Sequence, residues 1–287
     1  MELSDREFEL LREYIHKICG LTIPDNKAYL IHQRLEPLVK ASGCRSFHEF
    51  HEKIRQSYSS ILNEQIISAI TTNETSFFRD GHPFTAFKEY ILPKLARGIQ
   101  QRKAWLKPAI KTRLWSAAAS TGQEPYSIAM LIHEYISDNK HPGISCEDFE
   151  ILATDISSKA ISKAISGEYT ELEIKRGLSS EIMAKYFKKT GANQVIKSSI
   201  QDMIKFRQIN LTRPFTVLGG FDVIFCRNVL IYFDKDTVFR IINQFCNLLS
   251  DDGFLILGAT ENLYAVTDKF DSVRYGDTII FKKQDKP

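Results

Sequence analysis

The sequence lacks the features that mark secreted, membrane-spanning and strongly nucleic-acid-binding proteins. Its five cysteines are an odd number and no two are spaced as C-x-x-C, so we expect reduced, buried thiols rather than disulfides. The charged start MELSDREFELL has no apolar signal segment, and no apolar run reaches the roughly 18 residues of a membrane span. A net charge of +3 is too small to indicate nucleic-acid binding by charge alone. We therefore expect a cytoplasmic protein without membrane insertion.

Metal-ligand spacing is also missing. His48 and His51 come closest, but the second histidine is one residue too early for the H-E-x-x-H motif. The pair predicts a solvated helix face, and we expect no metal site.

The first part of the chain is helical in pattern. Residues 1–70 contain capping-box sequences that begin at Ser4 and Ser46, apolar residues at helical spacing, and no strand signal. Asp25 is expected to cap a helix over residues 26–41, and Pro37 to kink or end it. This part predicts a small all-α domain, followed by a linker loop and helix at 71–109.

From residue 110 the pattern changes to short, β-rich apolar runs that alternate with helical stretches. The runs lie at 113–119, 149–156, 221–228, 253–259 and 278–283. Apolar strands that alternate with helices predict an α/β domain over 110–287 with a doubly wound, largely parallel sheet. The alternation breaks at 166–210. There, residues 195–211 suggest an antiparallel hairpin, so we place an inserted β-subdomain at about 183–208.

Three predicted strands end in residues that suit a nucleoside cofactor, and ligands of such sheets bind at the carboxyl ends of the strands. The first strand is followed by small residues at 117–122, the second ends in Asp155, and the third in Cys226–Asn228. Each feature alone also fits tight packing or a helix N-cap. Their succession on three strands favours a nucleoside, with Asp155 accepting hydrogen bonds from the ribose hydroxyls.

Charge distinguishes between two nucleoside cofactors, NAD and S-adenosylmethionine. The first turn lacks the G-x-G-x-x-G of dinucleotide sites, and Glu124 lies at the start of the following helix. A carboxylate there would repel a pyrophosphate but not the sulfonium and ammonium groups of S-adenosylmethionine. The sequence therefore predicts a methyl donor.

The methyl acceptor is not indicated by a nucleic-acid motif. The stretch FCRNVLIYF has no proline, as amine-methylating nucleic-acid enzymes would require, and Cys226 follows Phe225 rather than a proline. The polar stretch TTNETSFFRD at 71–80 is either an interdomain linker or a loop folded over the cofactor. We favour the loop, because its hydroxyl, amide and guanidinium groups are clustered donors.

These motifs together resemble those of one family. The segments TTNETSFFRD, AASTGQEPYSIA, ATDIS, INL and FDVIFCRNVLIYFD resemble, in order, the motifs of the chemotaxis protein-glutamate O-methyltransferases, the CheR family. The resemblance covers essentially the whole chain. It implies an all-α domain, a Rossmann-like S-adenosylmethionine-dependent domain with an inserted β-subdomain, and methylation of glutamate side chains on the cytoplasmic helices of chemoreceptors.

The resemblance also implies residue roles. Positions that match the family's motifs are expected to form the cofactor site: Asn73, Thr75, Arg79, Glu124, Asp155, Asn210, Leu211, Arg227 and Asn228. Tyr232 is a candidate substrate contact, and Arg34 and Lys40 are the basic residues expected to meet the acidic receptor. Arg79 is expected to orient either the substrate or the cofactor, because its planar fork can hold a carboxylate by two hydrogen bonds.

The sequence alone leaves two alternative functions open. The chain is also compatible with an S-adenosylmethionine-binding sensor or adaptor without catalysis, or with the same chemistry on a soluble signalling partner. For the favoured function we expect a monomer that is recruited to membrane receptor arrays. The turn at 188–194 is short, so binding of a receptor C-terminal peptide by the β-subdomain is not predicted.

Overall fold

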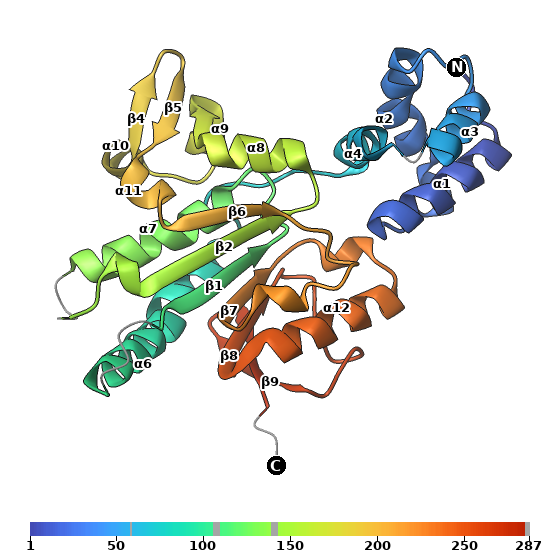
Figure 1. The fold of residues 1–287 in the computed structure, drawn as a ribbon. Helices are drawn as coiled ribbons and strands as arrows, with labels where there is room; N and C mark the ends of the chain where they lie inside the picture. Colours follow the sequence, from blue (N-terminus) through green and yellow to red (C-terminus); the bar gives the residue numbers. More distant parts are fainter. Residues whose placement is uncertain (58, 106–109, 139–142, 285–287) are drawn as a thin grey trace.

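The computed structural model describes residues 1–57, 59–105, 110–138 and 143–284. A helical domain, blue in Figure 1, lies beside a larger α/β domain, and a small β-subdomain, golden yellow at the upper left, projects from the α/β domain. In the described part of the chain, no helix is long and apolar enough to cross a membrane. These residues also contain no group of three or more metal-ligating side chains that could hold an ion.

The N-terminal domain has the predicted all-α fold. Its helices are α1 (Asp5–Cys19), α2 (Ala28–Ala41), α3 (Phe47–Ser57) and α4 (Ser60–Ile70). The predicted capping box at Ser4 is present, with Glu7 bonding back to the cap. The helices enclose a core of their own that includes Leu11, Ile31 and Phe50.

The structure corrects the predicted start of α2 and shows that Pro37 does not end the helix. Asp25 does not cap the helix, because it lies in a preceding 3-10 turn, η1 (Asp25–Lys27), and Lys27 occupies the cap position. Pro37 does not end the helix, which continues to Ala41. Both Pro37 and Gln33 are exposed, so water can satisfy the Gln33 carbonyl that a proline leaves without a donor.

The main sheet has seven strands in the order β6-β2-β1-β7-β8-β10-β9. The first five are parallel, and the last two pair antiparallel at one edge. The strands are β1 (Thr112–Ala117), β2 (Phe149–Asp155), β6 (Ile204–Gln208), β7 (Phe221–Cys226), β8 (Leu249–Leu257), β9 (Phe270–Tyr275) and β10 (Thr278–Lys283). The predicted doubly wound sheet is therefore confirmed, with two antiparallel edge strands.

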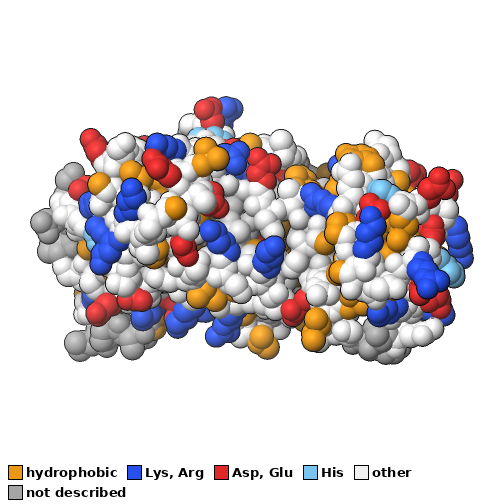
Figure 2. Space-filling view, turned by 90° about the horizontal axis from the view of Figure 1, so that it is seen from above, with side chains coloured by type: hydrophobic (Ala, Val, Ile, Leu, Met, Phe, Trp, Pro, Cys, Tyr) orange, Lys and Arg blue, Asp and Glu red, His pale blue; other side chains and the backbone are white. Residues whose placement is uncertain are grey.

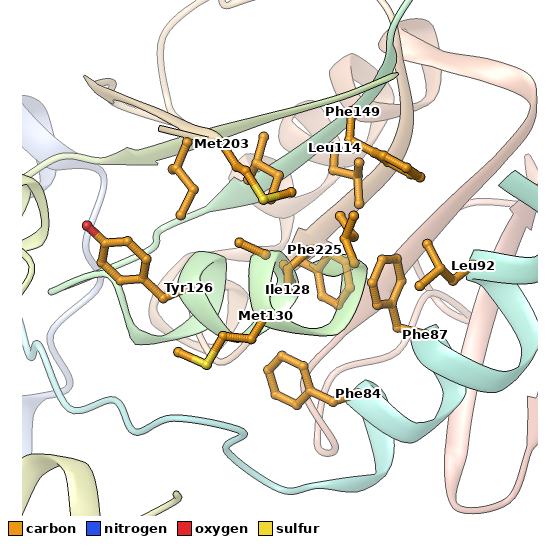
Figure 3. Packing of buried hydrophobic residues seen from close by; sticks show 14 of the residues in the cluster. Phe84, Phe87, Leu92, Leu114, Tyr126, Ile128, Met130, Phe149, Met203 and Phe225 are labelled. Atoms are coloured by element: carbon orange, nitrogen blue, oxygen red, sulfur yellow. The ribbon is translucent and has the colours of Figure 1, made fainter. Parts of the chain in front are cut away.

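Helices cover both faces of this sheet. They and the short turns of the α/β domain are α5 (His82–Ala86), η2 (Phe87–Ile91), α6 (Leu92–Ala104), α7 (Gln123–Ser137), η3 (Cys146–Asp148), α8 (Ser158–Ser166), η4 (Thr216–Leu218), η5 (Leu230–Tyr232) and α12 (Lys235–Leu248). Neighbouring residues of β1 enter opposite cores, as strand alternation requires. Leu114 packs with Phe84, Phe87 and Tyr126 on one face (Figure 3), whereas Trp115 packs on the other.

The β-subdomain differs from its predicted extent. Its three antiparallel strands, β3 (Glu168–Thr170), β5 (Asn193–Ile196) and β4 (Phe187–Thr190), span residues 168–196 rather than 183–208. Helices α9 (Glu171–Lys175), α10 (Ser180–Tyr186) and α11 (Ser198–Gln201) accompany them.

The predicted hairpin at 195–211 does not form. β5 belongs to the small sheet, whereas β6 pairs in parallel with β2 in the main sheet. Alternating apolar residues, such as Ile204 and Phe206, are common to a hairpin and to an edge strand, so this pattern does not identify the partner strand.

Candidate active site

One pocket lies between the two domains, at the carboxyl ends of β1, β2 and β7. It brings together all of the predicted site residues except Lys40. The α/β domain and the linker supply most of the lining, and the helical domain supplies a wall that includes Cys19, Leu21, Pro24 and Arg34. Both domains are therefore needed to form the pocket.

The backbone around this pocket is strained. Among the described residues other than glycine, five have a positive φ, between 48° and 69°, namely Phe78, Asp80, Ala118, Ser120 and Asn228. All five lie in the linker loop, the β1–α7 turn or the loop after β7. Each such conformation costs on the order of 1–3 kcal/mol, and such residues cluster at ligand sites, where the surroundings hold them.

Asp155 ends β2 and is held by backbone amides. Its Oδ1 accepts from Ser157 N at 2.9 Å and its Oδ2 from Ser120 N at 2.8 Å. Burial raises the pKa of this carboxyl, although these hydrogen bonds act in the opposite direction. A carboxylate has about four lone-pair positions, so each oxygen can accept one further hydrogen bond. The arrangement suits two adjacent hydroxyl groups such as those of a ribose.

Glu124 and Arg227 form the charged centre of the pocket. The Arg227 side chain, 2% exposed, donates from Nη1 to Glu124 at 2.9 Å and from Nη2 to Asp80 at 2.7 Å. Arg227 Nη2 also donates to the Arg79 carbonyl at 2.8 Å, and Glu124 accepts from Ser116 Oγ at 2.8 Å. Because one guanidinium serves two carboxylates, the cluster carries an excess negative charge. This charge suits a cationic ligand. Arg227 also joins the start of α7 to the linker loop, because it binds Glu124, Asp80 and the Arg79 carbonyl.

The linker loop is held against the pocket at several points. Asn73 O accepts from Ser120 Oγ at 3.0 Å, and Arg79 Nη1 donates to Glu74 O at 2.9 Å. The remaining N–H groups of Arg79 donate to no described residue. They are available to an acceptor in the pocket. Phe77 anchors the loop, since its ring packs edge-on against Tyr169 and Phe187 of the β-subdomain.

The opposite wall joins the domains. Asn210 Nδ2 donates to Ile18 O at 3.0 Å, and its Oδ1 accepts from Thr212 N and Oγ1. The Tyr232 carbonyl accepts from Thr22 N at 2.9 Å, while the Tyr232 side chain remains 37% exposed. The amide of Asn210 thus fastens α1 to the α/β domain.

The two basic residues predicted to meet an acidic substrate lie in different surroundings. Arg34 donates to Ile70 O at 2.6 Å, to Thr71 O at 3.1 Å and to Thr72 Oγ1 at 3.1 Å. Arg34 therefore holds the start of the linker. Lys40 lies outside the pocket and pairs with Glu36 at 2.9 Å. Basic and acidic side chains are intermixed over the face seen in Figure 2.

Sequence reasoning missed Glu261, which follows β8. Its carboxylate accepts four backbone N–H groups, from Gly258 and from Asn228, Val229 and Leu230 in the loop after β7. A signal existed in the sequence: GATENL follows the apolar run of a fourth strand, at the same edge of the sheet as the other polar strand ends.

Two family models match the chain. The all-alpha domain of the CheR methyltransferases matches residues 6–71, and the S-adenosylmethionine-binding domain of the CheR methyltransferases matches residues 73–279. The chain belongs to the CheR methyltransferase family. The second match begins at residue 73, so it includes the linker loop and the helices after it.

Relatives of the CheR family match over almost their whole length. A chemotaxis protein methyltransferase of Pseudomonas putida is 37% identical, with 98% of this chain and 99% of that protein covered. One from Vibrio cholerae is 38% identical, with 98% of each covered, and one from Escherichia coli is 31% identical, with 94% and 89% covered. The predicted family and cofactor are confirmed: this is an S-adenosylmethionine-dependent methyltransferase.

Proposed function

We propose that this CheR family member transfers a methyl group to glutamate carboxylates on the cytoplasmic helices of chemoreceptors. The products are glutamate methyl esters and S-adenosylhomocysteine. The observation that carries the proposal is the absence of a suitable general base among the described residues that line the pocket. They include no histidine, and burial raises the pKa of the Cys19 thiol to about 11.

A carboxylate is the acceptor that such a pocket suits. Glutamate is ionised at neutral pH and needs no base, whereas a lysine amine or a hydroxyl must lose a proton. The three carboxylates among the described residues of the pocket each have a partner: Glu124 binds Arg227, Asp155 accepts from backbone amides, and Glu74 pairs with Arg176 at 3.6 Å. The enzyme therefore has mainly to align the reacting atoms and to exclude water.

The residues present fit S-adenosylmethionine. When bound, it supplies a methyl group activated by the neighbouring sulfonium. Asp155 is proposed to hold the ribose, and the excess negative charge around Glu124 to attract the cationic end. Asn73, Thr75, Asn210, Leu211, Arg227 and Asn228 complete the proposed walls.

Two residues are proposed to act on the reacting groups. Arg79 has unused donors and orients a carboxylate, of the substrate or of the cofactor. Tyr232 is half-exposed at the pocket and contacts the substrate. Arg34 and Lys40 are proposed to attract the acidic receptor, although Arg34 acts partly through the linker that it binds.

We propose that the protein works as a monomer at receptor arrays in the cytoplasm. The decisive experiment incubates the protein with radiolabelled S-adenosylmethionine and cytoplasmic receptor fragments, followed by mapping of the label. Base-labile label on receptor glutamates supports the proposal. Label confined to a soluble signalling protein, or cofactor binding without any turnover, would replace it with one of the two alternatives.

A further inference from the structure

Glu261 is a buried carboxylate whose hydrogen bonds converge on the loop after β7. Its Oε1 accepts from Val229 N at 2.9 Å and Leu230 N at 2.7 Å. Its Oε2 accepts from Asn228 N at 2.8 Å and Gly258 N at 2.7 Å. The residue is 9% exposed, and no described cation pairs with it. All four partners are backbone groups, so the carboxylate acts on the path of the loop.

The loop needs such a partner because its conformation is unfavourable. Asn228 has a φ of 58°, which a residue with a Cβ rarely adopts. Three consecutive N–H groups turn toward one point, and a single carboxylate can accept them all. Gly258 leaves the room for this, since a Cβ there would lie 2.7 Å from Glu261 Oε2 and 2.8 Å from Asn228 N.

The far end of the same loop is fixed separately. Thr22 of the helical domain donates its N–H to the Tyr232 carbonyl, and Asp234 caps α12 by accepting from Thr237 N. Glu261 and Thr22 thus bracket Asn228 and Tyr232, both of which line the pocket. Neither Glu261 nor Gly258 itself lines the pocket, so any effect on the reaction passes through the loop.

We propose that Glu261 is a positioning residue for methyl transfer: its carboxylate fixes the loop that presents Asn228 and Tyr232 to the reacting groups. The inference rests on the proposed function, because Tyr232 of this loop is proposed to contact the substrate and Asn228 to complete the cofactor wall. Asp155 and Ser120, after the ends of β2 and β1, bind each other on the proposed cofactor side, and neither is among the hydrogen-bond partners of Glu261.

The test uses Glu261→Gln, which keeps the shape of the side chain. An amide has one acceptor oxygen, so its NH2 group faces two of the four N–H donors and displaces the loop. Displacement by about 1 Å can cost up to about a hundredfold in rate. We expect kcat on receptor fragments to fall by tenfold to a hundredfold, and the affinity for S-adenosylhomocysteine to fall by clearly less, because Asn228 is one of several cofactor-wall residues and Asp155 is not disturbed.

Two further variants make the result decisive. Gly258→Ala disturbs the same contact while leaving Glu261 in place, and we expect the same loss of kcat with a smaller loss of cofactor affinity. Glu150→Gln is the control, because it removes a partly buried carboxylate that pairs with Arg113 and Lys205 at the other end of β2. Its kcat should equal that of the wild type, even if its melting temperature is lower.

Hydrogen exchange of the amides at 228–230 tests the loop without any turnover. We expect these amides to be protected in the wild type and in Glu150→Gln, and to exchange faster in Glu261→Gln. Unchanged exchange, an unchanged kcat, or a loss of cofactor affinity equal to the loss of kcat would each overturn the inference. If the wild type methylates no receptor fragment, the proposed function fails, whereas the exchange data still show whether Glu261 holds the loop.

Discussion

Two carboxylates on strand β2, Glu150 and Asp155, show how differently the two ends of the main sheet are built. Glu150 accepts from Lys205 Nζ at 2.5 Å and Arg113 Nε at 3.1 Å, and the hydrogen bond with Lys205 is the main cause of its lowered pKa. Asp155 has only backbone N–H partners, and burial raises its pKa. The same chemical group is thus neutralised by cations at one end and held without them at the other.

The difference separates stability from function. At the Glu150 end, Arg113 also donates to the carbonyls of Leu218 and Gly220. Side-chain contacts there connect β1, β2 and the segment before β7. At the Asp155 end, the partners are backbone amides, which occupy little volume, and the carboxylate lines the pocket. Removing charge should therefore affect mainly folding at the first end and mainly binding at the second.

The strongest way to break this comparison is Asp155→Ala. Two charge-assisted hydrogen bonds to a ribose are each worth about 1.5–3 kcal/mol, so affinity for S-adenosylhomocysteine should fall by about a hundredfold or more. The variant should remain folded by circular dichroism. Calorimetry measures the affinity, with Glu150→Gln as the matched control that binds normally. Unchanged affinity in Asp155→Ala would remove the ribose assignment.

Arg79→Ala tests the cation that faces the same pocket. Its free donors predict a loss of turnover of about tenfold to a hundredfold with little loss of stability. If Arg79 orients the substrate, cofactor affinity stays near normal, and if it binds the cofactor's carboxylate, affinity falls together with turnover. The measurements are steady-state kinetics on receptor fragments and calorimetry with S-adenosylhomocysteine. Wild-type values in both would contradict either role.

Acid titration sharpens the comparison without any mutation. The pKa of Asp155 is raised, so in the folded protein it takes up its proton at a higher pH than an ordinary aspartate of about 3.9. The pKa of Glu150 is lowered, so its contribution to stability is present above about pH 4.3 and is lost as the pH falls through the lower folded value. Cofactor binding should therefore weaken at a higher pH than the acid unfolding of the protein. Coincident loss of binding and of the circular dichroism signal would contradict this order.

The sequence allowed prediction of the parts of the site that lie at strand ends, because a strand's polarity fixes where its last residues lie. Asp155 ends an apolar run, Asn228 follows one, and Glu124 lies just beyond the small-residue turn after β1. The structure places all three at the pocket. Partners that depend on pairing between distant segments were not predictable in this way. β6 joins the main sheet instead of forming a hairpin, and Glu261 reaches the loop after β7 only because β7 and β8 are neighbours.

Two cations of α2, Arg34 and Lys40, differ in a similar way: one helps to form the pocket and the other pairs on the surface. Arg34 binds the carbonyls at the start of the linker, whereas Lys40 pairs with Glu36 on the outer surface. Although the cofactor is proposed to bind in the α/β domain, we expect its affinity to depend on Arg34. The linker that Arg34 holds reaches Ser120 beside Asp155.

The smallest effects are expected from the matched variants Arg34→Gln and Lys40→Gln, which each remove one positive charge from α2. Arg34→Gln should weaken cofactor binding a few-fold at every salt concentration, because it frees the linker. Lys40→Gln should leave cofactor affinity unchanged and lower receptor methylation a few-fold at low salt only, since exposed charges act through steered association that salt screens. Methylation rate and cofactor affinity across a salt series measure both. A salt-dependent loss in Arg34→Gln with cofactor affinity intact would show that Arg34 meets the receptor directly, as the sequence alone suggested.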